Sequence, residues 1–130
     1  MLKNIFVLFL VLFPFSIMAQ TPQEEWIDKL STCESQDRPA IKVLDINNKY
    51  SYGLLQFQLD TFYGFGKQYG FFPEGFTREE ARLMIHIPSL QRAIAKEMLD
   101  DGLDYHWKNC RDKKLGRYPI PYRQIVLLSP

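Results

Sequence analysis

The sequence predicts a mainly helical α+β domain that carries one small β-hairpin. Two capping boxes open apolar periodic segments, one at Thr21–Glu24 and the other at Thr77–Glu80. Between them, β-branched and aromatic residues flank an Asn-rich break, which predicts a short hairpin over residues 41–52. No repeat, low-complexity tract or linker divides the chain, so we expect a single domain.

The first 19 residues have the order of a secretory signal peptide. Lys3 precedes an apolar run from Ile5 to Phe15, and the segment Ser16–Ala19 then leads to a cleavage site after Ala19. The run is shorter than the roughly 20 apolar residues of a transmembrane helix. An uncleaved membrane anchor is the alternative. We therefore expect an exported protein, periplasmic or secreted, whose mature domain covers residues 20–130.

The charge of the mature chain argues against general nucleic-acid binding. Cleavage removes Lys3 and no acid, which lowers the net charge from +1 to zero. Basic residues nevertheless gather near the C-terminus, where one acid, Asp112, stands among Lys108, Arg111, Lys113, Lys114, Arg117 and Arg123. This end is either a solvated tail or a contact with an anionic polymer or an envelope assembly. We expect a monomer.

The first helix is predicted to begin after Thr21, its N-cap. Apolar positions recur at helical spacing on one face, at Trp26, Ile27, Leu30 and Cys33. Glu34 follows at the C-terminal end, where the helix macrodipole disfavours a carboxylate and raises its pKa. Pro39 bounds the helix, because the residue before a proline is biased out of the helical conformation.

The segment after the hairpin has weaker signals. Leu54, Leu55 and Phe57 are too few to define a period, and a short helix is one interpretation of them. Asp60 or Thr61 then caps a helical segment that runs toward residue 69, although two glycines weaken it.

Three later helices have clearer boundaries. The capping box at Thr77 opens a helix that Pro88 is expected to end. Ser89 begins the next, which Gly102 terminates and whose buried face holds Leu90, Ala93, Ile94 and Met98. Asp104 caps a last short helix through Trp107 and Cys110. The apolar run at residues 125–128 has no predicted place.

The chain has two cysteines, and their spacing allows two interpretations. In an exported protein they predict one disulfide, Cys33 to Cys110, which closes a long loop and stabilises by roughly 4 kcal/mol. Alternatively, His106 and Cys110 have zinc-ligand spacing, and Cys33 and His86 complete a set of four. Export favours the disulfide, so we expect no metal and no other cofactor.

Two motifs in order resemble those of a known family. Residues 34–40, ESQDRPA, resemble the Glu-Ser-x-x-Asn/Asp-Pro-x-Ala opening of soluble-lytic-transglycosylase-like (SLT) domains of the lysozyme superfamily, with one residue fewer before the final Ala. Residues 51–57, SYGLLQF, resemble the downstream Ser-x-Gly-Leu-Met/Leu-Gln signature. The resemblance covers about residues 24–62. The family's Ala-Tyr-Asn-like third element is not visible, and residues 104–107 and 109–110 stand in a comparable place.

This resemblance implies a lysozyme-like fold whose hairpin lies beside an active-site cleft. It also implies a peptidoglycan lytic transglycosylase that cleaves the β-1,4 bond between MurNAc and GlcNAc. In that family a hydroxyl of the muramyl sugar is the nucleophile, so Glu34 alone serves as general acid and then base, and 1,6-anhydro-muramyl ends result.

The resemblance carries over further site residues. Ser51 would brace the glutamate or touch the substrate, Gly53 would let backbone approach the sugar, and Gln56 would donate hydrogen bonds to it. Tyr52 and Tyr105 are candidates for stacking on sugar faces, although such aromatics are as often core residues.

Two alternatives remain open at this point. If a second carboxylate reaches the cleft, with Asp45 as first candidate and Asp37 as next, a hydrolytic muramidase on the same fold is the outcome. The missing third motif supports the other alternative, a catalytically silent protein that binds glycan strands or a partner through the cleft.

Overall fold

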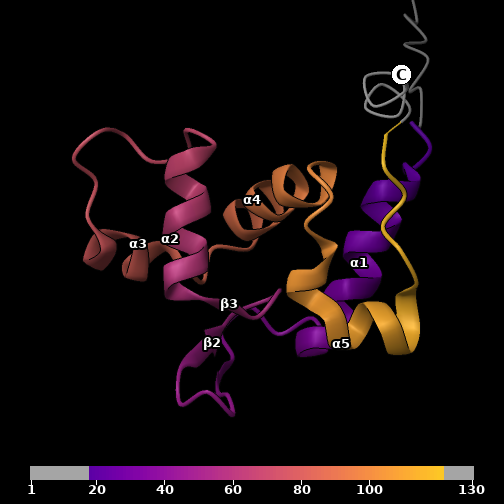
Figure 1. Cartoon of the computed structure of the whole chain (residues 1–130), viewed down its shortest axis with the longest axis horizontal. Helices are drawn as coiled ribbons and strands as arrows, with labels where there is room; N and C mark the ends of the chain where they lie inside the picture. The colour runs from indigo at the N-terminus through magenta and orange to yellow at the C-terminus, as the bar shows by residue number, and fades with distance from the viewer. Residues whose placement is uncertain (1–17, 122–130) are drawn as a thin grey trace, which may run out of the picture.

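The computed structural model describes residues 18–121, so all but the last two residues of the expected signal peptide at 1–19, and the apolar run at 125–128, lie outside the described residues. The protein is α+β and mainly helical, as predicted (Figure 1). Along the chain the elements are α1 (Pro22–Ser35), β1 (Lys42–Leu44), β2 (Tyr50–Tyr52), β3 (Phe57–Gln58), α2 (Leu59–Gln68), α3 (Arg78–Met84), α4 (Pro88–Asp100), the 3₁₀ turn η1 (Asp104–Trp107), α5 (Lys108–Cys110) and the π-helical turn η2 (Arg111–Leu115).

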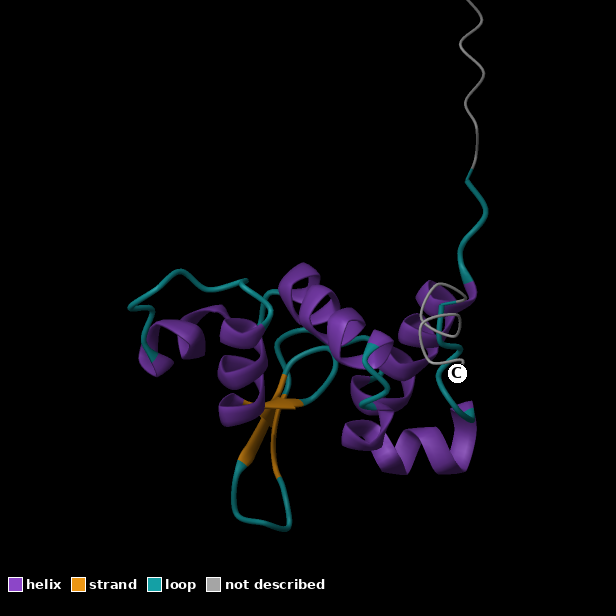
Figure 2. Cartoon of the chain, turned by 45° about the horizontal axis from the view of Figure 1, so that its top comes forward, coloured by secondary structure: helices purple, strands orange, loops and turns teal. Residues whose placement is uncertain are grey.

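The predicted hairpin is present and forms part of a larger sheet. The three strands are antiparallel in the order β1-β2-β3, with Val43 opposite Ser51 and Ser51 opposite Gln58. The hairpin projects away from the helices (Figure 2). The strand β3 was not predicted, and the interpretation of this segment as a short helix was wrong. Residues 53–56 instead form a tight turn in which Gly53 and Gln56 both have positive φ, so the chain reverses onto β2.

Helix α1 has the predicted boundaries. The hydroxyl of Thr21 accepts a hydrogen bond from the Glu24 amide, and the Glu24 carboxylate accepts one from the Thr21 amide, so the capping box is complete. The helix ends at Ser35, and Gln36 caps it in the left-handed conformation with φ 54°. Glu34 therefore lies in the last turn, as the sequence predicted.

The structure corrects two helix boundaries. Helix α3 begins after the capping box of Thr77 as predicted, but it ends at Met84 and not at Pro88. Pro88 is instead the first residue of α4, where its missing N–H costs nothing and its fixed φ suits the helix. Helix α2 begins at Leu59, without a side-chain cap, and not after Asp60 or Thr61, because β3 leads directly into it.

Trp107 joins the C-terminal turns to the core. Its indole N–H donates to the Leu55 carbonyl at 2.9 Å, and its ring meets Phe57 edge to face at 5.4 Å. Around it the core gathers side chains from α1, α2 and α4, among them Leu30, Phe62 and Met98, all fully buried. None of the described helices has both the length and the apolar character needed to cross a bilayer.

Gln91 connects α4 to the turn at residues 53–56. This amide is fully buried, donates to the carbonyls of Tyr52 (2.8 Å) and Ile85 (2.5 Å), and accepts from the Leu55 amide (2.8 Å). A Cβ on Gly53 would lie 2.5 Å from its Nε2. The periodicity of α4 predicted its buried face, and Ile94 is fully buried, but an amide at the centre of that face was not expected.

We predict that Gln91→Leu lowers the free energy of unfolding by about 3 kcal/mol, because it leaves buried backbone groups without hydrogen-bond partners. Urea denaturation followed by tryptophan fluorescence measures the change. As a control, Gln68→Leu at the exposed end of α2 should change stability by less than about 0.5 kcal/mol. Equal effects of the two substitutions would show that the Gln91 network contributes little.

Candidate functional site

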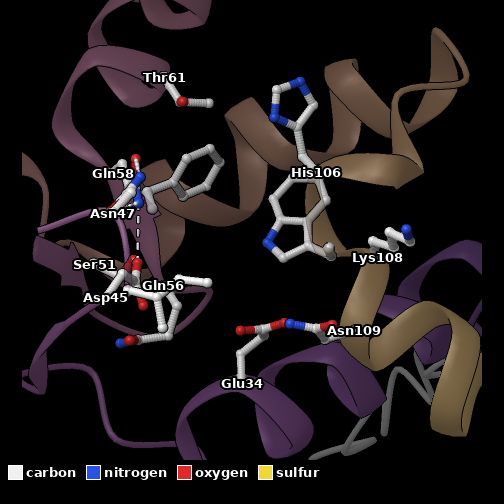
Figure 3. A pocket seen from close by; sticks show the side chains of 13 residues that line it. Glu34, Asp45, Asn47, Ser51, Gln56, Gln58, Thr61, His106, Lys108 and Asn109 are labelled. Carbon is white, nitrogen blue, oxygen red and sulfur yellow. Dashed lines mark hydrogen bonds between the residues drawn. The ribbon is translucent and has the colours of Figure 1, made fainter. Parts of the chain in front are cut away.

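A cleft of about 630 Å³ separates the sheet from the C-terminal turns. Figure 3 shows one wall formed by side chains of the hairpin and the start of α2, and the other by residues 106–109, with Glu34 projecting between them from the end of α1. The lining mixes carboxylates, amides and hydroxyls with the rings of Phe57 and Trp107. It therefore suits a ligand with both polar groups and apolar faces.

Glu34 has the most perturbed carboxyl group of the cleft. Burial, and to a smaller extent the negative charge of Asp45, together raise its pKa to about 7. The helix macrodipole also led us to expect a raised pKa for Glu34, but the main physical cause is desolvation. Among the described residues, none donates a hydrogen bond to the Glu34 carboxyl group or accepts one from it, so its proton is available to a ligand.

The residues on either side of Glu34 hold it in place. Cys33 forms the predicted disulfide with Cys110, which joins α1 to α5. Ser35 is buried, and its hydroxyl donates to the Leu54 carbonyl at 2.7 Å. The two motifs noticed in the sequence are thus joined by this hydrogen bond, a role for Ser35 that sequence reasoning missed.

Asp45 lies in the same cleft and is held by two neighbours. The hydroxyl of Ser51 and the amide of Gln58, the latter at 3.0 Å, both donate to its Oδ2. Ser51 was expected to brace Glu34 or touch the substrate; it lines the cleft, but its hydrogen bond goes to Asp45. Asp37, the other candidate, instead accepts hydrogen bonds from the hydroxyls of Ser31 and Thr32 on α1, which lower its pKa.

Of the other expected site residues on the sheet side, Gln56 lines the cleft, whereas Gly53 and Tyr52 do not. Gln56 lines the cleft, and its Nε2 donates to the Gly53 carbonyl at 2.9 Å. Gly53 is buried and packs against the side chain of Gln91. The group that approaches its backbone closely is therefore the Gln91 amide. Tyr52 packs against His86 and lines a separate pocket, because side chains alternate along β2 and Ser51 takes the cleft side.

The C-terminal wall is formed by residues 106–109. Tyr105, a candidate for stacking on a sugar, does not line the cleft; it is exposed and stacks on His106, with ring centroids 4.5 Å apart, and His106 lines the cleft. Burial lowers the pKa of His106. Asn109 and Lys108 also line this wall. The sequence does contain a signal for Asn109. This residue directly precedes Cys110, Glu34 directly follows Cys33, and the two cysteines were expected to pair.

The remaining expectations concern metals and the basic end. Both cysteines are in the disulfide, so neither supplies a thiolate to zinc. The basic end is not a uniform cationic surface, because the Arg111 guanidinium pairs with Asp104 at 2.9 Å and with Asp112 at 2.8 Å. Arg123 lies outside the described residues.

We predict that Glu34→Gln is more stable than the wild type at pH 8 by about 2 kcal/mol, and equally stable at pH 4. The pKa of Glu34 is raised in the folded state, so its stabilising contribution is present below about pH 4.5 and is lost as the pH rises through about 7. Urea unfolding at pH 4, 6 and 8 measures the difference. Glu74→Gln in an exposed loop should show no such dependence; a constant offset for Glu34→Gln would contradict the raised pKa.

Comparisons with known proteins do not assign this cleft to a family. A scan of family models and searches of curated proteins and of solved structures find no match to this chain. The functional proposal therefore depends on the geometry and chemistry of the cleft residues themselves.

Proposed function

We propose that this protein cleaves the β-1,4-glycosidic bonds of peptidoglycan glycan strands, with Glu34 as the general acid. The carrying observation is a carboxyl group with a pKa of about 7, without a hydrogen-bond donor among the described residues, in a cleft lined by polar groups and aromatic rings. Cleavage of a glycosidic bond needs a proton on a poor leaving oxygen, and a carboxyl group supplies it near neutral pH only if its pKa is raised.

The arrangement of the cleft supports a lysozyme-like fold as part of this proposal. A carboxyl group at a helix end beside a small antiparallel sheet is what the SLT-like motifs imply, and the Ser35–Leu54 hydrogen bond joins those motifs. Hydroxyls and amides along the walls, such as Thr61, Gln56 and Asn109, offer donors and acceptors for sugar hydroxyl and acetamido groups. The substrate class also implies export, which agrees with the expected signal peptide.

The resemblance favours the lytic route as the first candidate. Glu34 donates its proton to the leaving glycosidic oxygen as the C–O bond breaks, and its carboxylate then takes the proton of the muramyl hydroxyl that closes the 1,6-anhydro ring. Net protonation of Glu34 is restored, and no water is consumed. One carboxyl group suffices for this sequence of steps.

The position of Asp45 favours a second candidate, hydrolysis. A carboxylate that two hydrogen bonds hold in the same cleft as the acid can activate water or stabilise the charge that develops on the sugar ring. In this muramidase route water supplies the oxygen at the cleaved carbon, and reducing ends result.

We predict that Glu34→Gln lowers the rate of muropeptide release from purified peptidoglycan by about 10³-fold, since the amide cannot donate the proton. The wild-type rate should fall as the pH rises above about 7, because the acid form of Glu34 is then lost. Mass spectrometry of the released fragments measures both effects. No release by either protein would favour a silent glycan-binding protein and contradict the enzyme proposal.

We predict that Asp45→Asn distinguishes the two routes. Anhydro ends, with activity reduced less than about 10-fold, are expected of the lytic route, because Asp45 takes no direct part in it. Reducing ends, with activity reduced about 10²-fold or more, are expected of hydrolysis. Asp37→Asn is the matched control, because Asp37 does not line the cleft and an Asn side chain keeps its hydroxyl partners.

A further inference from the structure

The disulfide places Asn109, a residue to which no role has yet been given, next to Glu34. The Cα atoms of Cys33 and Cys110 lie 6.0 Å apart, and Glu34 follows the first while Asn109 precedes the second. Consecutive Cα atoms are separated by only about 3.8 Å, so a covalent path of fixed length holds the backbones of Glu34 and Asn109 near each other.

Both side chains enter the same space. Glu34 and Asn109 both line the cleft, and Figure 3 shows the Asn109 amide directed toward the carboxyl end of Glu34, one from α5 and the other from α1. Within the described part of the chain, the Asn109 side chain makes no hydrogen bond. Its donor and acceptor are therefore both available to a ligand.

Neighbouring side chains on the same wall suit this place less well. His106 is engaged in stacking with Tyr105 and meets Phe65 edge to face at 5.4 Å. Lys108 and Asn109 are both exposed, but Lys108 has a long flexible stem and would bring a positive charge. Asn109 is short, uncharged and adjacent to a half-cystine, so it can position a ligand without adding a charge beside Glu34.

We propose that Asn109 is a substrate-binding residue that holds a sugar substituent, a hydroxyl or acetamido group, beside the glycosidic oxygen that Glu34 protonates. This inference rests on the proposed function. The Asn109 amide faces Glu34 from the wall opposite the sheet. The sugar would therefore bind between Asn109 and the hydrogen-bonding groups of the hairpin. Because the disulfide anchors the acid and the amide together, their separation does not depend on the position of the hairpin.

The first test measures whether Asn109 lies beside Glu34. Asn109→Asp places a second carboxylate there, which should raise the pKa of Glu34 and move the loss of activity to higher pH by about one pH unit. Asp45, His106 and Lys108 also face the cleft and titrate, so the Glu34 carboxyl carbon is followed directly by NMR. Gln68→Glu, an amide-to-acid change at the exposed end of α2, is the matched control. An unmoved Glu34 titration in Asn109→Asp overturns the inference.

The second test measures binding of a defined glycan. A tetrasaccharide of alternating GlcNAc and MurNAc is titrated into Glu34→Gln protein, with and without Asn109→Ala, and Gln68→Ala serves as control. We expect Asn109→Ala to weaken binding at least 10-fold; unchanged binding, or no binding by Glu34→Gln, overturns the inference. Wild-type cleavage of peptidoglycan with unchanged binding would leave the proposed function standing. Weakened binding without any cleavage would support Asn109 and reject catalysis.

Discussion

The disulfide between Cys33 and Cys110 is the constraint on which the site depends. It connects the last turn of α1 to the short helix α5 across 77 residues of sequence, and its two neighbours, Glu34 and Asn109, face the same cleft. On chain-entropy grounds a loop of this length restricts the unfolded chain by roughly 4 kcal/mol. The same bond therefore stabilises the domain and holds Glu34 close to the C-terminal wall of the cleft.

Hydrogen bonds around the cleft fix elements that the disulfide does not reach. Ser35 ties the end of α1 to the turn after β2, and Gln91 ties that turn to α4, so the turn is fixed from two sides. Ser51 and Gln58 hold Asp45 on the sheet wall. Glu34 is the exception, because it is half-buried without such donors among the described residues. This carboxyl group is destabilising at neutral pH, and that cost is what keeps its proton ready for transfer.

Local signals predicted those elements that local chemistry decides. The capping boxes at Thr21 and Thr77 determined where α1 and α3 begin, since a side chain and a nearby backbone amide suffice for a cap. The hairpin followed from alternation around an Asn-rich break. Pro88 was misplaced because a proline is compatible both with the end of one helix and with the first turn of the next. The strand β3 has two residues, too few for any period to appear.

The sequence by itself determined that Glu34 stands at a helix end beside a half-cystine, because capping, helical period and proline position are all local. Only the tertiary structure decided what faces it. Asp45 reaches the cleft because β1 and β2 pair in one register, which also turns Ser51 toward Asp45 and Tyr52 away. Asn109 reaches it through a disulfide that spans most of the domain. Such partners depend on contacts between distant segments, which no local pattern of residues specifies.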